Sequence, residues 1–294
     1  MILLRLTGGL GNQLFQYAAG RSLADLWKVP LKIDTTSFWN DRLRQYALRP
    51  FRIRAEQASF FDRRRFENVF ANGIEKRISI FFPHKNGKIW KDPNHGYNPP
   101  PQNPEKEIYL DGYWQSWRYF FANEPAIRRD LKLEIPAGGI NLRLSEEIRS
   151  ASSVSIHIRR ADYVDDSNAA RVHGVCDMSY YKRAVKWIEE RVHQPRFYIF
   201  SDDPLWVRQN FDLCSDPVVV GHNDGVQAFE DLRLMASCRH HIIANSTFSW
   251  WGAWLSNQPG KTVLCPATWF ADSAVVPDMK QFMDDLLPSE WVRL

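Results

Sequence analysis

The chain has 294 residues, 44% hydrophobic and 24% charged, which is typical of a soluble globular protein with two domains of ordinary size. No apolar run approaches the roughly 20 residues that a bilayer-spanning helix needs. Residues 1–132 carry 22 Lys and Arg against 13 Asp and Glu, whereas residues 133–294 carry 16 against 21. The basic half is either an ordinary solvated surface or a region that meets an anionic partner, such as a lipid-linked acceptor at a membrane.

The cysteines are widely spaced and form no C-x-x-C pair; they are Cys176, Cys214, Cys238 and Cys265. This spacing disfavours a disulfide framework or a zinc site and predicts four buried, reduced thiols in the cytoplasm. The first residues are interrupted by Arg5 and three glycines, which is a poor pattern for a signal peptide.

The first elements form a predicted βαβ unit, with strands at residues 2–6 and 31–34 and a helix at 13–27. Its glycine-rich turn nearly fits G-x-G-x-x-G from Gly9: Gly11 matches, but the third position is Leu14. Asp34 follows at the end of the second strand, where a ribose-binding acid would sit. The turn therefore either offers the helix N-terminus to a ligand or is a tight turn only.

The region before the middle of the chain is the hardest to interpret. Short helical pieces are expected around residues 55–70, and residues 83–104 are rich in proline and asparagine, which predicts a long irregular loop. A strand at 107–110 leads into an aromatic stretch at 112–120. There Trp114 could stack on a sugar while Gln115 bonds its hydroxyls, or the aromatic rings could form a buried core.

The second half alternates strands and helices, which predicts a doubly wound parallel sheet. The best domain boundary is at residues 131–139, where prolines and glycines gather. Helices are expected at 141–150, 179–193, 226–237, 246–255 and 279–287 and after Asp202, and strands at 153–158, 196–200, 217–220, 241–244 and 262–265.

Two arginines, Arg159 and Arg160, follow the strand at 153–158. Ligands bind at the carboxyl edge of open α/β sheets, and a guanidinium fork fits a phosphate with two hydrogen bonds. This pattern predicts an anion clamp, with a structural Arg159–Asp162 pair as the alternative.

A second turn, residues 245–249, places small hydroxyls at a predicted helix N-terminus, where they either help to hold an anion or simply cap the helix. The chain has no pair of aspartates at D-x-D spacing. A diphosphate would then be neutralised by arginine and backbone N–H groups rather than through a carboxylate-bound metal.

At these motifs the sequence resembles the bacterial α-1,2-fucosyltransferases of glycosyltransferase family 11, whose relatives include the animal blood-group H enzymes. The resemblance rests on four segments in order, with residues 111–115 also similar: 8–17, 157–163, 198–203 and 245–254. Residues 35–105 match little beyond length. Animal members carry an N-terminal membrane anchor, and the lack of one here leads us to expect a cytoplasmic enzyme.

The resemblance implies a GT-B arrangement of two Rossmann-like domains that face a cleft. The expected domains are residues 1–135 on the acceptor side, 136–275 for the donor, and 276–294 as a segment that packs back toward the first. The family implies GDP-β-L-fucose as donor, inversion at C1 and no metal or other cofactor. The implied acceptor is a terminal galactose in a glycan such as O-antigen.

The resemblance also implies roles for individual residues. Arg159 would meet the β-phosphate, while His157 and Asp231 would approach the guanine. Asn12, in the loop with Gly9 and Gly11, would face the fucose or the reacting centre. The phosphates would be held by Ser246, Thr247 and the Phe248 amide. For acceptor binding, the candidates are Trp114 and Gln115 of the aromatic stretch described above.

A base must take the proton of the acceptor hydroxyl. Asp162, Asp165 and Asp166 are all within reach of the arginine motif, and Asp162 could equally pair with Arg160. Two other functions fit parts of the sequence. The glycine turn with Asp34 suits a nicotinamide-dependent oxidoreductase, and the basic, aromatic first half suits an RNA-binding module.

Overall fold

The structure is a computed structural model that describes residues 1–66, 87–92, 96–100, 107–160, 174–272, 276 and 278–294. Its chain forms two compact units, Met1–Ile135 and Pro136–Leu294, called unit 1 and unit 2 below. In the described part, no helix is both long and apolar enough to cross a bilayer.

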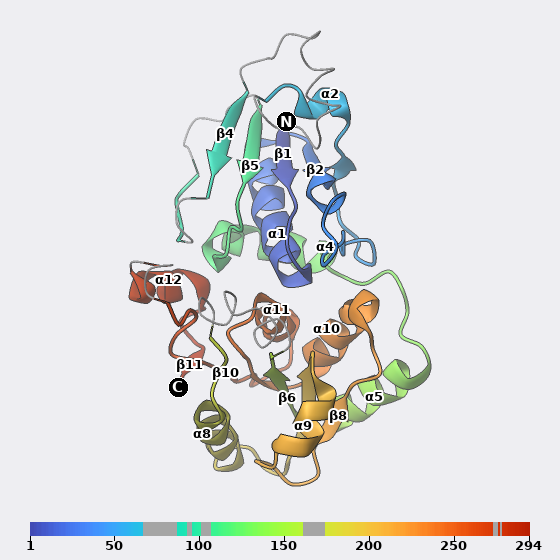
Figure 1. The fold of residues 1–294 in the computed structure, drawn as a ribbon, viewed down its shortest axis with the longest axis vertical. Coiled ribbons are helices and arrows are strands. Elements are labelled where there is room, and N and C mark those ends of the chain that lie inside the picture. Colours follow the sequence, from blue (N-terminus) through green and yellow to red (C-terminus); the bar gives the residue numbers. More distant parts are fainter. Residues whose placement is uncertain (67–86, 93–95, 101–106, 161–173, 273–275, 277) are drawn as a thin grey trace. The chain divides into compact units, whose positions relative to one another are not determined.

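Unit 1 is built on a parallel sheet with the strand order β3-β2-β1-β5-β4 (Figure 1). Its elements are β1 (Ile2–Arg5), α1 (Leu10–Trp27), β2 (Leu31–Asp34), η1 (Thr36–Phe38), β3 (Glu56–Gln57), α2 (Phe60–Arg63), β4 (Lys88–Lys91), β5 (Ile108–Asp111), η2 (Trp117–Tyr119), η3 (Phe121–Asn123) and α4 (Glu124–Asp130).

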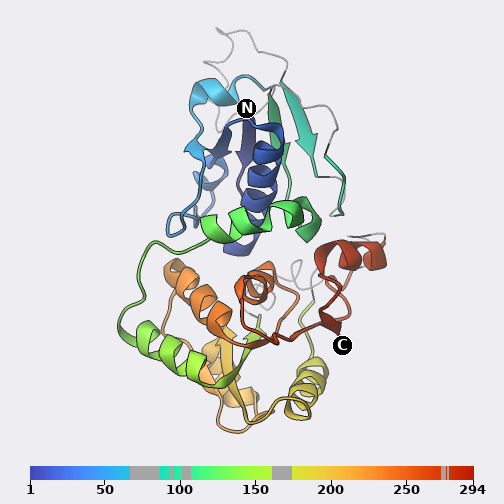
Figure 2. The same cartoon turned by 180° about the vertical axis from the view of Figure 1, so that it is seen from behind.

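Helix α1 lies against the sheet of unit 1, and Figure 2 shows it with α4 on the face turned away from the viewer in Figure 1. Gly20 permits this close approach, because a Cβ there would lie 3.0 Å from Leu4 Cδ2. The opposite face carries a smaller cluster of Leu3, Phe66 and Tyr109. The sheet is thereby buried on both sides at its centre, as parallel sheets require.

Unit 2 contains a six-stranded parallel sheet with the order β11-β10-β9-β6-β7-β8. Its elements are α5 (Gly139–Ser150), β6 (Ser152–Ile158), α8 (Met178–Glu189), β7 (Pro195–Ser201), α9 (Pro204–Asn210), β8 (Val218–Val220), η4 (Gly225–Gln227), α10 (Ala228–Ser237), β9 (His240–Ile242), α11 (Thr247–Leu255), β10 (Val263–Cys265), α12 (Met279–Leu286) and β11 (Val292–Arg293).

Two apolar clusters flank the sheet of unit 2. Side chains of α8 and α9 pack on one face, with Val154 and Ile199 at its centre. Side chains of α5, α10 and α11 pack on the other face, around Phe200 and Val220. The predicted doubly wound sheet of the second half is confirmed, and each helix N-terminus that follows a strand lies at the carboxyl edge.

Three short strands were not predicted from the sequence. A loop was expected at residues 83–104, but residues 88–91 form β4. Helical pieces were expected at residues 55–70, but residues 56–57 form β3. The third, β11, extends the sheet beside β10. Two-residue and four-residue edge strands carry too little alternation to be recognised, and β4 has lysines at both ends, which suit an exposed edge.

The carboxy-terminal segment belongs to unit 2. There β11 pairs with β10, and Trp250 Nε1 of α11 donates to the Leu286 carbonyl 2.9 Å away. The expected packing of residues 276–294 toward the first domain stays a prediction. The four cysteines are free thiols, of which Cys214, Cys238 and Cys265 are buried and Cys176 is half-buried.

Candidate functional site

The sheet of unit 2 reverses its winding direction between β6 and β9. From β6 the chain builds outward through β7 and β8, and then returns to place β9 on the other side of β6. Ile156 of β6 is paired with Ile242 of β9, so the segments after both strands start side by side. Open α/β sheets bind ligands at such a switch point. The predicted motifs at 157–160 and 245–249 begin there.

His157 is a neutral imidazole at this edge. It is 5% exposed, and its Nδ1 has no hydrogen-bond partner in the described part of the chain. Burial, with the positive charge of Arg159, lowers the pKa of His157 to about 3. The ring lies 5.7 Å from that of Phe248, and the backbone carbonyl accepts from Tyr181 Oη. A fixed neutral ring can hydrogen-bond a ligand, but it adds no positive charge.

The two arginines have different surroundings. The guanidinium of Arg160 lies 3.8 Å from the ring centre of Trp206, and its Nε is 4.0 Å from Asp203 Oδ2. Its backbone N–H donates to Asp202 Oδ1. Arg160 is thus anchored to the segment that starts α9. Arg159 is half-buried beside His157.

Several predicted residues fall outside the described part of the chain, namely Asp162, Asp165 and Asp166. The alternatives that pair Asp162 with either arginine therefore stay predictions. The contacts of Arg160 with Trp206 and Asp203 were not predicted, because those residues are more than 40 positions away and nothing local marks them.

The second turn prepares a helix N-terminus. Ser246 is the N-cap of α11 and is 5% exposed, yet its side chain caps none of the amides of the first turn. The expected alternative of simple side-chain capping is therefore wrong. The first amides of an α-helix have no partner within it, and they favour an anion. Thr247 and Phe248 are the first two residues of this helix.

Asn245 ties this turn to two segments that are distant in sequence. Its Nδ2 donates to the carbonyls of Gly174, at 3.2 Å, and Trp269, at 3.0 Å, and its Oδ1 accepts from Cys176 Sγ. It is 6% exposed. No role for Asn245 was predicted, although its position directly after the predicted strand at 241–244 was an available signal.

Asp231 lies in the first turn of α10. Its Oδ1 accepts from Asn223 Nδ2 at 2.7 Å. Burial raises the pKa of Asp231 to about 6, and the hydrogen bond from Asn223 opposes this shift. An aspartate held in this way can accept N–H groups of a ligand when it is ionised.

Unit 1 has a switch point of its own, between β1 and β5. Gln115 Nε2, after β5, donates to Oδ1 of Asn12, in the first turn of α1, at 3.0 Å. Gly9 is the N-cap of α1 and Gly11 is buried within it. The unusual backbone, however, is at Gly8, whose φ is +75° and where a Cβ would lie 2.7 Å from Asn12 Nδ2.

Two fully buried glutamines hold this turn in place. Gln13 Nε2 donates to the carbonyls of Gly8 and Gln45, both at 2.8 Å. Gln16 accepts from the Thr7 amide and donates to the Gly112 carbonyl, so it ties the end of β1 to the end of β5. Neither glutamine was predicted, because in the sequence both look like ordinary helix residues.

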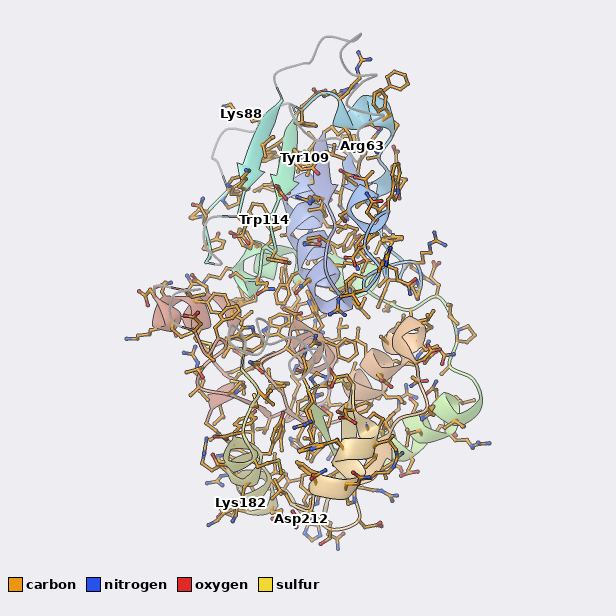
Figure 3. All side chains as sticks on the ribbon, in the orientation of Figure 1. Arg63, Lys88, Tyr109, Trp114, Lys182 and Asp212 are labelled. Atoms are coloured by element: carbon orange, nitrogen blue, oxygen red, sulfur yellow. The ribbon has the colours of Figure 1, made fainter. Side chains whose placement is uncertain are left out.

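Trp114 is a core residue of unit 1. It is 1% exposed, and its ring packs against Trp90, at 4.9 Å, and Tyr119, at 5.5 Å. It lies near the carboxyl ends of β4 and β5 (Figure 3). The alternative that the aromatic rings form a buried core therefore fits Trp114. A role of Trp114 in acceptor binding stays a prediction. Gln115 is 8% exposed.

Asp34 is engaged within the protein. It is 2% exposed and accepts from Tyr109 Oη at 3.0 Å and from the amide and hydroxyl of Thr36. A carboxylate with these partners is not available to a ribose. The feature that suited a nicotinamide cofactor is thus structural.

Comparisons with known proteins give consistent results. A model of glycosyl transferase family 11 matches residues 1–293. An alpha-1,2-colitosyltransferase of Escherichia coli is 32% identical, and the alignment covers 100% of this chain and 99% of that protein. The O-antigen biosynthesis glycosyltransferase WbnK of Escherichia coli is 30% identical, and the alignment covers 90% of this chain and 94% of that protein.

Among solved structures, NodZ alpha-1,6-fucosyltransferase soaked with GDP-fucose is similar in fold. Its TM-score is 0.52 at 18% identity, over 86% of this chain and 91% of that one. The predicted GT-B fold class, with two parallel-sheet α/β domains, is confirmed, and the cleft between them stays a prediction.

Proposed function

We propose, since the chain belongs to glycosyl transferase family 11, that it transfers L-fucose from GDP-β-L-fucose to the 2-hydroxyl of a terminal galactose, with inversion at C1. The acceptor would be a glycan such as O-antigen. The relatives support a glycosyl transfer of this type, since one is named an alpha-1,2-colitosyltransferase and another an O-antigen biosynthesis glycosyltransferase.

One observation carries the proposal, which is the combination of groups at the switch point of unit 2. His157 and Arg159 stand at the end of β6, and the helix N-terminus at Ser246 follows β9, the strand paired beside it. The cation and the amides suit a diphosphate, whereas the neutral ring suits a base. We assign the phosphates to Arg159, Ser246, Thr247 and Phe248, and the guanine to His157 and Asp231.

In the proposed reaction, the acceptor oxygen attacks C1 of fucose as the bond from C1 to the β-phosphate oxygen breaks. The electron pair of that bond leaves with GDP. A guanidinium about 4 Å from a unit charge stabilises it by on the order of 4 kcal/mol at an effective dielectric constant of about 20. Arg159 would supply this stabilisation as the charge develops.

The proton of the acceptor hydroxyl must go to a base. We assign this role to one of Asp162, Asp165 and Asp166. Asn12 carries an amide, which orients a hydroxyl but takes no proton at neutral pH. Because Gln115 donates to Asn12, we assign both residues to the sugar side of the reaction. We assign no part in it to a metal.

The test is product formation from defined substrates. The protein is incubated with GDP-fucose and a panel of β-galactosides, and the products are analysed by mass spectrometry and by NMR of the new linkage. We expect an α-1,2-fucosyl galactoside, with the same rate in excess EDTA. GDP-colitose in parallel sharpens the choice of sugar. Transfer from GDP-colitose alone would overturn the fucosyl assignment, and hydrolysis without transfer to any galactoside would overturn the acceptor.

We also propose a cytoplasmic protein whose basic first half touches anionic lipid surfaces, on the grounds of the charge asymmetry. Liposome flotation tests the contact. Binding should increase with the fraction of anionic lipid and decrease with salt. Flotation that does not depend on anionic lipid would remove the membrane from the proposal.

A further inference from the structure

Four polar side chains form a hydrogen-bonded chain around the start of α10. Asn141, in the first turn of α5, and Asn223, in the segment after β8, bond each other through both amide groups, at 2.9 and 3.2 Å. Asn223 Nδ2 also donates to Asp231 Oδ1 at 2.7 Å. His222 Nε2 lies 2.7 Å from Asn141 Oδ1. Two reciprocal amide bonds fix the orientation of Asn223, and Asn223 in turn fixes the carboxylate.

The position of Asp231 on its helix shows which way it faces. Residues three, four and seven positions later are Leu234, Met235 and Cys238, and these three belong to the core cluster that covers Phe200 and Val220. Side chains at these spacings share one face of a helix. Asp231 therefore lies on the sheet-facing side of α10, at its carboxyl-edge end. Phe248, which contacts His157, packs on the same cluster.

The carboxylate of Asp231 is only partly used. Asn223 occupies Oδ1, while Oδ2 accepts no hydrogen bond from any residue that the structure describes. The Asp231 side chain is half-buried, so a donor from a ligand can take the place of water at this oxygen. Guanine offers two adjacent donors, N1–H and the 2-amino group, to one carboxylate. Adenine presents an acceptor, N1, at the corresponding position, which a carboxylate would repel.

We propose that Asn223, oriented by Asn141, is a positioning residue that sets the plane of the Asp231 carboxylate for guanine and thereby sets base specificity. This inference rests on the proposed function, since it presumes that the nucleotide is bound at this edge. It assigns no chemical step to Asn223. The role of Asn223 is to let the Asp231 carboxylate discriminate between guanine and bases without a 2-amino group.

The test compares GDP with IDP, whose base lacks the 2-amino group, by calorimetry on the full chain. The wild type should bind GDP about tenfold or more tighter than IDP, the effect of one hydrogen bond to a charged group. In Asn223→Ala this ratio should fall toward one, mainly through weaker GDP binding. Asn141→Ala should lower the ratio less, because it loosens Asn223 without removing it. The matched control is Asn257→Ala, an exposed amide of unit 2, which should keep the ratio.

Each outcome decides one of the two proposals. An Asn223→Ala protein that binds both nucleotides more weakly by the same factor overturns the positioning role, since general damage lowers both affinities alike. Equal affinities in the wild type overturn it too, while the donor proposal stands. A wild type that binds neither nucleotide overturns the proposed function and this inference with it. Should Asn223→Ala fail to fold, the ratio in Asn141→Ala decides.

Discussion

The two switch points of this molecule share a topology but differ in how their polar groups are used. In unit 1, Gln13 and Gln16 donate to backbone carbonyls, and Asn12 accepts from the side chain after β5. Both carboxylate oxygens of Asp34 accept hydrogen bonds within the protein. In unit 2, His157 Nδ1 and Asp231 Oδ2 lack partners among the described residues, and Arg159 adds a charge. A parallel sheet with a turn and a helix is therefore not by itself an anion site. The groups left open at its edge decide that.

The largest effect expected from a single change is on stability, in unit 1. Trp114→Ala should lower the free energy of unfolding by about 3–5 kcal/mol, because it empties the space between Trp90 and Tyr119. Chemical denaturation measures this, with Trp114→Phe as the milder control. Unchanged stability with a much higher KM for the galactoside would instead show that Trp114 binds the acceptor. Both switch points would then present side chains to a ligand.

Arg159→Ala tests the charged side of the comparison. We expect kcat to fall by about 10²–10³, since the leaving phosphate loses a positioned cation. Arg159→Lys should recover little, because the two-pronged geometry of the guanidinium is gone. Steady-state kinetics with GDP-fucose measures both. The control is Arg191→Ala, an exposed arginine paired with Glu190. Near-normal turnover in Arg159→Lys contradicts the assignment.

Gly8→Ala tests the turn of unit 1, whose polar groups have partners within the protein. A residue with a side chain at φ +75° is strained, and its Cβ would meet Asn12 Nδ2. The expected loss is about 1–2 kcal/mol in the free energy of unfolding. Gly225→Ala, where a Cβ meets nothing within 4 Å, should change stability little. If both variants unfold alike, the turn at Gly8 is less constrained than its geometry indicates.

Sequence patterns located the long, strongly patterned elements. The first βαβ unit and the alternation after residue 140 were predicted because buried parallel strands are apolar runs and the helices between them are long. The strands β3, β4 and β11 were missed because two to four residues at an edge carry little pattern. The boundary between residues 135 and 136 falls within the predicted proline- and glycine-rich stretch.

The candidate site was predictable only in part. His157 lies near the end of the strand β6 and Ser246 caps α11, so local pattern and family resemblance locate both. Asn141 and Asn223 are 82 positions apart, and Arg160 contacts the ring of Trp206 in α9. No local pattern marks such contacts, since they depend on the fold as a whole. The same holds for the glutamines that close the turn of unit 1.

The smallest expected effect is a dependence of GDP binding on pH. Burial raises the pKa of Asp231 to about 6, with Glu230 adding a like charge nearby and Asn223 opposing the shift. The ionised form that accepts N–H groups should therefore increase as pH rises through 6, while His157 stays neutral throughout. We expect GDP to bind roughly tenfold more weakly at pH 5 than at pH 7 through this group, a difference that calorimetry resolves.

The phosphates of GDP also titrate in this range, so Asp231→Asn serves as the reference, and the slope it retains is subtracted. Stability should follow the opposite trend in the protein without nucleotide. A raised pKa means that the folded chain binds more protons than the unfolded chain between about pH 4 and 6, so the free energy of unfolding falls as pH rises there. In Asp231→Asn that fall should disappear. If the pH dependences of GDP affinity and of unfolding free energy are the same in wild type and Asp231→Asn, the Asp231 carboxylate is ionised throughout this pH range. The contrast between unit 2 and unit 1 would then be smaller than the unpaired groups of unit 2 indicate.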